Sequence, residues 1–206
     1  LLPDGHVEVL RGGSKYNEIR TMLVDLHAEG SNTLTDVGCN TGLVSFLAHH
    51  AGFLRVSALD HDREAVAVVR AVAETRQLAI GAEYFTFGQR AIPEADVVFC
   101  GALIHWVFCL TADFQGNFTR ILQYVAVAAK KYLIIEWVAP EDAALREFHH
   151  VEKCHNKGAL HDTYSTAAFI AALHTVGTIA QSRTIGARTL FVVRTAAKVL
   201  ESLGTS

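Results

Sequence analysis

The sequence is poor in residues that interrupt or cross-link a chain, and neither sign of charge is in excess. Only three prolines occur in 206 residues. The four cysteines (Cys39, Cys100, Cys109 and Cys154) are scattered without a CxxC pair. That spacing excludes a zinc or redox site built on a CxxC motif. Scattered cysteines of this number are expected to be reduced thiols, which indicates a reducing, cytoplasmic compartment. The chain has 18 basic and 21 acidic residues and a net charge of −3, so its overall charge does not indicate nucleic-acid binding. A local basic patch is not excluded by this count.

Long apolar runs are absent as well. None approaches the roughly 20 residues that a membrane-spanning helix needs, and no signal-peptide pattern opens the chain. The chain begins with Leu1, so we expect either trimmed ends or a domain taken from a longer protein. Half of the residues are hydrophobic, which excludes a disordered chain and is enough for one domain over residues 1–206.

Short β-rich runs alternate with amphipathic segments along the whole chain. Such alternation is typical of a doubly wound sheet. The pattern predicts strands over 33–37, 54–59, 83–87, 96–100 and 132–137, and helices over 17–28, 43–51, 63–78, 114–130 and 166–175. Residues 179–184 and 189–194 are predicted to pair as a hairpin around Gly186. We therefore expect an α/β fold with a doubly wound, seven-stranded, mostly parallel sheet that ends in an antiparallel β-pair.

The strongest local signal is the run from Asp36 to Gly42, which follows a predicted strand and precedes a predicted helix. Gly38 and Gly42 suit a sharp turn and remove side chains where the backbone passes close to a ligand. The N–H groups of the helix that follows attract an anionic group such as a carboxylate. The spacing is neither GxGxxG nor GxxxxGK[ST], so it favours neither dinucleotide phosphates nor a nucleoside triphosphate.

A second signal is Asp60, which ends the second predicted strand. An acidic side chain at such a strand end is placed to accept hydrogen bonds from ribose hydroxyls. The glycine loop alone is weak evidence. Together with Asp60 at the neighbouring strand end, it is a more specific indication of a ligand that carries both a carboxylate and a ribose.

Residues 33–60 resemble the cofactor-binding region of class I S-adenosylmethionine (SAM)-dependent methyltransferases, and the likeness extends in order over about residues 15–195. The resemblance implies SAM as cofactor and S-adenosylhomocysteine (SAH) as product. It places the methionine moiety at the loop and the ribose at Asp60. The implied cofactor-binding residues are Asp36, Gly38, Cys39, Asn40, Gly42, Asp60, His61, Gln89, Gly101, Lys15 and Tyr16. Gln89 stands where the family often has Asp, but its amide oxygen can also accept from the adenine amine.

The "GCNTG" form of the loop, with Lys15 and Tyr16 upstream, is most similar to bacterial-type enzymes that methylate sugars or other small molecules. Motifs of other subclasses are absent: no [DNS]PP[YF], no Pro-Cys nucleophile, no paired glutamates and no acidic metal ligands of the catechol type. The resemblance therefore implies a small molecule, a sugar or a lipid-linked glycan as acceptor. An RNA methyltransferase is the main competing enzyme.

The acceptor side is expected after the fourth strand and after the fifth, because ligands bind at the carboxyl ends of the strands in this fold. His105 is the candidate general base, since an imidazole titrates near neutral pH; a purely structural role for it is the alternative. Residues 138–165 are the candidate lid over the acceptor. The candidate substrate residues are Trp106, Trp137, His150, His155 and Tyr164.

Residues 147–162 are rich in histidine, with Cys154 among them, and so invite a metal-binding interpretation. Their spacing matches no standard zinc pattern, so no metal site is predicted. Two further functions stay open at this point. The chain can be a module that binds SAM without catalysis, or an NAD(P)-binding Rossmann domain, although the loop spacing and the terminal β-pair argue against the second.

Overall fold

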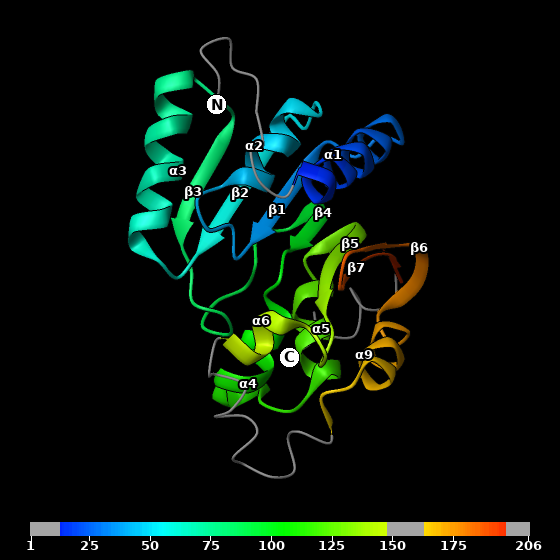
Figure 1. The fold of residues 1–206 in the computed structure, drawn as a ribbon. Coiled ribbons are helices and arrows are strands. Elements are labelled where there is room, and N and C mark those ends of the chain that lie inside the picture. The colour runs from blue at the N-terminus through cyan, green and yellow to red at the C-terminus, as the bar shows by residue number, and fades with distance from the viewer. Residues whose placement is uncertain (1–12, 148–162, 197–206) are drawn as a thin grey trace, which may run out of the picture. The chain divides into compact units, whose positions relative to one another are not determined.

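In the computed structural model, which describes residues 13–147 and 163–196, seven strands form one sheet in the order β3-β2-β1-β4-β5-β7-β6 (Figure 1). The expected fold class is confirmed: the sheet is mostly parallel and ends in an antiparallel pair. The chain divides into two compact units, residues 1–99 and 100–206. None of the described helices is long and apolar enough to cross a membrane.

The first unit is built on parallel strands. Strand β1 (Thr33–Val37) pairs with β2 (Arg55–Asp60), and β2 pairs with β3 (Ile80–Tyr84), both in parallel. Strand β4 (Ala95–Cys100) is the last strand of the first unit in chain order. The buried positions of β1 and β2 are nearly continuous, as expected for strands covered on both faces.

Three helices pack in the first unit. Helix α1 (Gly13–Ala28) packs on α2 (Leu43–His50), which lies on β1 and β2, and α3 (Arg63–Arg76) lies on β2 and β3. Asp62 is the N-cap of α3: its carboxylate accepts from the Glu64 and Ala65 N–H groups at 2.8 and 3.3 Å. Such a cap satisfies backbone donors that have no partner inside the helix.

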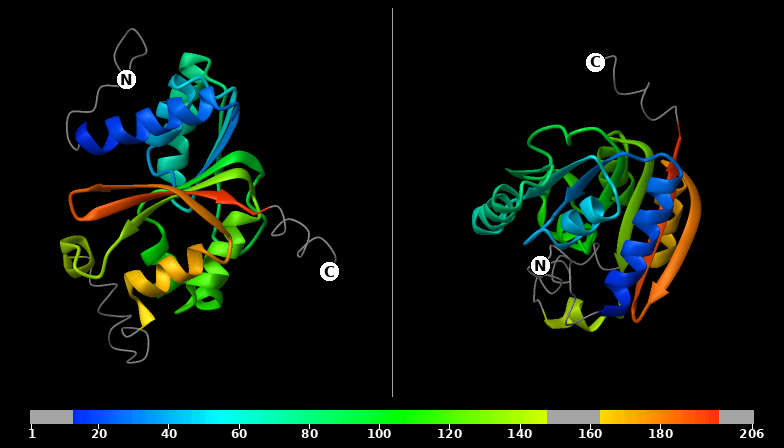
Figure 2. Two further views of the ribbon diagram at one scale, coloured as in Figure 1. Left: turned by 90° about the vertical axis from the view of Figure 1, so that its right-hand side faces the viewer. Right: turned by 90° about the horizontal axis from the view of Figure 1, so that it is seen from above.

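The second unit surrounds the long strand β5 (Ala129–Val138). Strand β7 (Arg188–Thr195) pairs with it in antiparallel fashion, and β6 (Gly177–Ile185) pairs with β7 as the expected hairpin. The hairpin is drawn in orange and red in both views of Figure 2. The helices in the described part of the second unit are α4 (Ile104–Leu110), α5 (Phe118–Ala126), α6 (Ala143–Glu147) and α9 (Thr166–Leu173), with a 3-10 turn over Ala112–Phe114.

Stacked aromatic rings form the core of the second unit. The Trp137 ring on β5 is stacked on Phe169 of α9 with 4.2 Å between centroids and on Tyr164 with 5.0 Å. Phe118 of α5 packs edge-on against Trp137 at 5.5 Å. One face of β5 is therefore sealed by α5 and α9.

The structure corrects the bounds of two predicted elements and adds one helix that was not predicted. The strand expected over 83–87 runs from Ile80 to Tyr84, because residues 86–89 turn: the Gln89 N–H donates to the Thr86 carbonyl at 3.2 Å. The helix expected over 114–130 begins only at Phe118, since Gly116 has a φ of 73° and Asn117 caps the helix. Helix α4 was not expected at all.

Candidate functional site

The glycine loop lies between β1 and α2 and is joined to the end of β2. The Gly38 and Cys39 N–H groups both donate to the Leu59 carbonyl, at 2.8 and 3.0 Å. These two bonds hold the start of the loop against the carboxyl end of the neighbouring strand. The loop is thus positioned by the sheet itself.

Three residues of the loop have left-handed backbone conformations. The φ values are 76° at Gly38, 48° at Asn40 and 84° at Gly42. Asn tolerates this region better than most residues, and the Asn40 side chain accepts from the Thr41 N–H at 2.6 Å. Gly42 precedes α2 without a side-chain cap. The Ser45 backbone N–H is bonded to the Asp36 carboxylate, so an anionic ligand is expected at the N–H groups that precede Ser45 in the first turn of α2.

Asp60 connects the end of β2 to this loop. Its carboxylate is 7% exposed, and its Oδ2 accepts from the Asn40 N–H at 2.7 Å. Its Oδ1 accepts from the Asp62 N–H at 2.9 Å and lies 3.2 Å from Nδ1 of the exposed His61. Each carboxylate oxygen has two lone pairs, so Asp60 can fix the loop and still accept from a ligand hydroxyl. The structure therefore brings Asn40, Asp60 and His61 together.

Asp36 lies beneath the loop rather than on its surface, at 2% exposure. The Ser45 hydroxyl from α2 donates to its Oδ2 at 2.7 Å. Burial raises the pKa of Asp36 to about 7, against the lowering effect of the Ser45 bonds. Burial, with the charges of Asp36 and Asp60, also raises the pKa of the Cys39 thiol, which disfavours its thiolate form.

The other cofactor-side candidates in the first unit belong to other elements, the turn after β3 and the first turn of α1. Gln89 is exposed in the turn after β3, and that turn begins where the Phe85 N–H donates to the Asp60 carbonyl at 2.8 Å. Lys15 and Tyr16 form the first turn of α1, with the Lys15 ammonium 5.1 Å from the centre of the Tyr16 ring. Their roles stay predictions.

Gly101, His105 and Trp106 belong to the second unit, directly after β4. His105 is buried in α4 at 5% exposure, whereas Trp106 is 36% exposed, and their ring centroids lie 5.5 Å apart. The Leu110 side chain, one turn further along α4, is 50% exposed. Helix α4 thus presents an aromatic and an aliphatic side chain to the surface.

The other substrate candidates fall into two groups. Trp137 is a core residue at 2% exposure, and its indole N–H donates to the Thr166 hydroxyl at 3.1 Å. Tyr164 stacks on it and donates its hydroxyl to the Val138 carbonyl at 2.7 Å. His150 and His155 lie outside the described residues, as does most of the expected lid. Within the described part of the chain, no group of His, Cys, Asp and Glu is arranged to hold a metal ion.

An ionic cluster that the sequence pattern did not predict lies at the carboxyl end of β5. Arg188 of β7 donates from Nη1 to Glu136 at 2.9 Å and from Nε to Asp142 at 3.0 Å. Glu136 and Asp142 are 2% and 6% exposed. Burial lowers the pKa of the Arg188 guanidinium, but the bonds and charges of the two carboxylates outweigh this effect and raise it. The only signal in the sequence was a charged residue, Glu136, inside an apolar strand.

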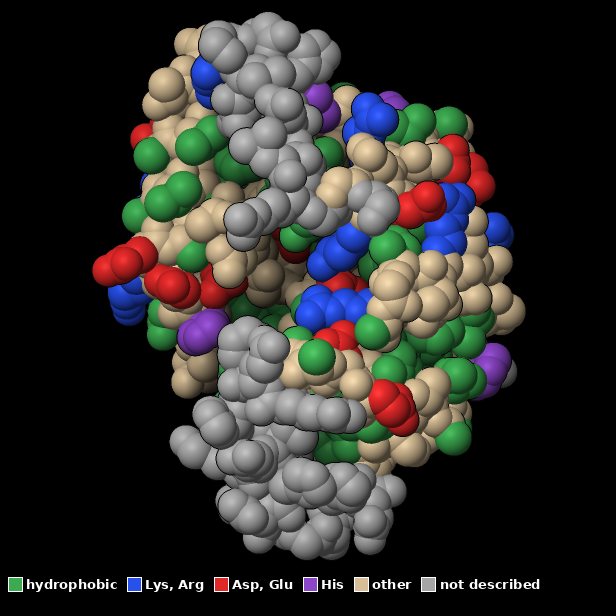
Figure 3. Space-filling view, viewed as in Figure 1, with side chains coloured by type: hydrophobic (Ala, Val, Ile, Leu, Met, Phe, Trp, Pro, Cys, Tyr) green, Lys and Arg blue, Asp and Glu red, His purple; other side chains and the backbone are tan. Residues whose placement is uncertain are grey.

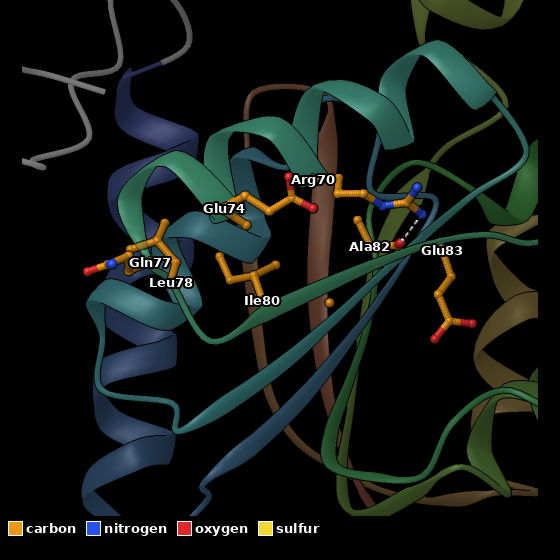
Figure 4. Close-up of a pocket in the computed structure, with 9 residues that line it drawn as sticks. Arg70, Glu74, Gln77, Leu78, Ile80, Ala82 and Glu83 are labelled. Carbon is orange, nitrogen blue, oxygen red and sulfur yellow. Dashed lines mark hydrogen bonds between the residues drawn. The ribbon is translucent and has the colours of Figure 1, made fainter.

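A separate hollow of about 410 Å³ lies between α3 and the edge strand β3 (Figure 4). The Arg70 guanidinium reaches from α3 to the Ala82 carbonyl at 2.9 Å and so satisfies an acceptor on the open edge of the sheet. Protecting an edge strand in this way discourages pairing with another chain. The hollow contains none of the candidate site residues.

Part of the chain is similar to a known domain family. Residues 35–128 match the model of the methyltransferase domain family. No protein of curated function matches the chain by sequence.

Solved structures show the same fold. The chain is similar to magnesium protoporphyrin IX methyltransferase from Synechocystis PCC 6803 with bound SAH, at 16% identity and a TM-score of 0.64 over 93% of this chain and 90% of that one. It is similar to mitomycin 7-O-methyltransferase at 20% identity and a TM-score of 0.61, over 90% of this chain and 55% of that one. A third is an O-methyltransferase family protein from Burkholderia thailandensis, at 14% identity and a TM-score of 0.60, over 88% and 56%.

Proposed function

We propose that the chain is a class I SAM-dependent methyltransferase and that it methylates a hydroxyl or amine of a small molecule, a sugar or a lipid-linked glycan. The methyltransferase-domain match over residues 35–128 and the fold shared with solved methyltransferases support the proposal. The observation that carries the proposal is the bond from the Asn40 N–H to the Asp60 carboxylate. It joins the glycine loop to the end of β2, so that a carboxylate site and a ribose site become one rigid unit.

The cofactor groups fit this unit by their chemistry. The methionine carboxylate matches the uncapped N-terminus of α2, and Lys15 or Tyr16 supplies a further donor from α1. The ribose hydroxyls donate to the remaining lone pairs of Asp60, and Gly38, Cys39 and Gly101 contact the cofactor through their backbone. His61 and Gln89 lie on the adenine side.

Methyl transfer breaks the bond from sulfur to methyl and forms one from methyl to the acceptor oxygen or nitrogen, leaving SAH. The protein's tasks are in-line alignment and the exclusion of water. A hydroxyl or ammonium acceptor also loses a proton, and we assign its removal to His105. Trp106 and Tyr164 line the acceptor side with His150 and His155, and Trp137 supports Tyr164 by stacking. In this proposal residues 1–206 form one domain, with 138–165 as its lid.

Small-molecule acceptors are favoured by two observations. The similar structures include enzymes whose names give magnesium protoporphyrin IX and mitomycin as substrates. On the face drawn in Figure 3, Lys and Arg side chains lie among Asp and Glu side chains rather than in one basic patch. A phosphate backbone needs such a patch for strong binding.

The experiment is an SAH-release assay with SAM and a panel of acceptors: phenol, methyl glucoside, a primary amine and a structured RNA. Turnover with one of the first three supports the proposal. Turnover with the RNA alone, with an affinity that falls steeply as salt rises, supports the RNA methyltransferase. SAM binding without turnover of any acceptor supports the non-catalytic module.

The proposed base is tested with His105→Gln in the same assay. Removing a general base lowers kcat about 100-fold or more, and the pH dependence that belongs to the imidazole disappears. A variant that keeps its kcat within about threefold at every pH leaves His105 with a structural role only.

A further inference from the structure

The cluster of Arg188, Glu136 and Asp142 has an unusual position for a purely structural ion pair. In the register of the sheet, Arg188 lies opposite Val138, the last residue of β5, and Glu136 lies two residues before it. Side chains two residues apart on a strand share a face, so Arg188 and Glu136 are diagonal neighbours on one face of the sheet. The opposite face is the one that Trp137 shares with α5 and α9. The cluster therefore lies outside the aromatic core, at the end of β5 where this fold binds ligands.

Burying these charges costs stability. Glu136 and Asp142 are both nearly inaccessible, and a buried carboxylate is tolerated only when it is paired and hydrogen-bonded. A well-packed apolar set of the same volume is often as stable as a buried ionic cluster, or more so. Local rules of this kind are broken chiefly at functional sites. The cluster is thus a candidate for a role in binding.

The two carboxylates fix the guanidinium in one orientation. Asp142 is itself held in place, because its Oδ1 accepts from the Ala144 N–H at the start of α6 at 2.8 Å. A guanidinium has five N–H donors in a planar fork, and the bonds to Glu136 and Asp142 use two of them. Within the described part of the chain the Arg188 guanidinium makes no other hydrogen bond, and the side chain is 29% exposed. The remaining donors of Nη1 and Nη2 are therefore oriented before any ligand arrives.

We propose that Arg188 binds an oxygen atom of the acceptor through these donors and sets how the acceptor lies for methylation. The proposal rests on the methyltransferase function and names the acceptor class more closely: a neutral molecule with a hydroxyl or carbonyl oxygen beside the methylated group. Arg188 is in this sense a specificity-determining residue for the reaction.

A neutral oxygen is a better partner here than an anion. The guanidinium already faces two carboxylates at 2.9 and 3.0 Å, so a third negative group gains little attraction from Arg188. It is also repelled by Glu136 and Asp142 at close range. A hydroxyl or carbonyl oxygen accepts the same hydrogen bonds without that repulsion.

The test is an NMR titration of the SAH-loaded protein that follows the guanidinium resonances of Arg188. The probes are phenol, methyl glucoside, acetate and methylamine, each added alone. We expect phenol or methyl glucoside to shift the Arg188 resonances in a saturable way, and acetate to leave them unchanged. The proposal is overturned if neither hydroxyl compound shifts them, or if acetate alone does.

A matched control lies on the same strand. Arg194 of β7 donates to the Tyr132 hydroxyl at 3.1 Å, far from the carboxyl end of β5 in the register. Arg188→Lys keeps a charge for the carboxylates but loses the planar fork. We therefore expect the Kd of the responding probe, followed in the variants through backbone amide resonances, to rise at least tenfold. Arg194→Lys should leave it within twofold. Equal effects of the two variants on this Kd would contradict the proposal and leave Arg188 with only a structural role in the hairpin.

Cofactor binding and acceptor binding by Arg188 can be tested separately. Calorimetry with SAH on the same sample reports the cofactor site, to which Arg188 does not belong. A protein that binds no SAH contradicts the proposed function. If the protein binds SAH but the Arg188 resonances do not shift with either hydroxyl compound, only the inference about the acceptor is contradicted.

Discussion

Gly42 ends the glycine loop at the point where α2 begins, and Gly42→Ala is the most informative single change there. A Cβ atom at this position would lie 2.7 Å from Val69 Cγ2 and 3.1 Å from Phe46 Cε2. Both side chains are buried, so neither can move away freely. The φ of 84° adds backbone strain to any residue other than glycine.

The expected cost has two parts. A left-handed conformation costs an alanine about 1–2 kcal/mol, and overpacking a well-filled core costs about 1–3 kcal/mol. Together the free energy of unfolding should fall by about 2–5 kcal/mol. The same shift at the start of α2 moves its N–H groups, so the affinity for SAM should also fall.

Gly30→Ala is the matched control. Its φ is 89°, but a Cβ there meets nothing within 4 Å, so only the strain of about 1–2 kcal/mol remains. Urea denaturation measures both variants, and calorimetry measures their affinity for SAM. If Gly42→Ala loses no more stability than Gly30→Ala, the close packing between the loop and α3 has been misjudged.

Two further predictions concern buried polar groups. The pKa of Asp36 is raised from 3.8 to about 7 by burial, so the folded state holds this proton more tightly than the unfolded state. The free energy of unfolding should therefore fall as pH rises from about 4 to 7, by about 4 kcal/mol at most. Asp36→Asn should remove most of that slope in denaturation curves, and an unchanged slope would contradict the assignment. Trp137→Phe leaves the Thr166 hydroxyl without its donor and thins the stacked core, so it should cost about 1–3 kcal/mol while SAM affinity stays within twofold. A large loss of SAM affinity would show that the aromatic core is coupled to the cofactor site.

Local sequence patterns predicted most of the first unit and the hairpin of the second unit. Strand β1 has the predicted bounds, and the hairpin of β6 and β7 turns at Gly186 as expected. Strand β3 was misplaced because it is an edge strand whose buried and exposed positions, from Ile80 to Tyr84, do not form a continuous apolar run. Helix α4 was missed because five of its seven residues are buried, which leaves no polar side to mark a helical period.

The candidate site was predictable where it is local in the chain. The loop from Asp36 to Gly42 and the strand end at Asp60 each follow from neighbouring residues, and their junction follows from parallel pairing of β1 and β2. The cluster of Arg188 could not be found in this way. Its partners lie 46 and 52 positions away in the sequence, and only the antiparallel register of β5 and β7 brings them together.

The central claim is that the glycine loop and the Asp60 carboxylate together bind SAM. Calorimetry with SAM on the unchanged protein, Asp60→Asn and Asp62→Asn tests it directly, since Asn still caps α3 at position 62. The account predicts saturable binding by the unchanged protein, a Kd at least tenfold higher for Asp60→Asn, and a Kd within twofold for Asp62→Asn. Binding that survives the loss of the Asp60 charge undiminished, or a folded protein without affinity for SAM, would contradict it.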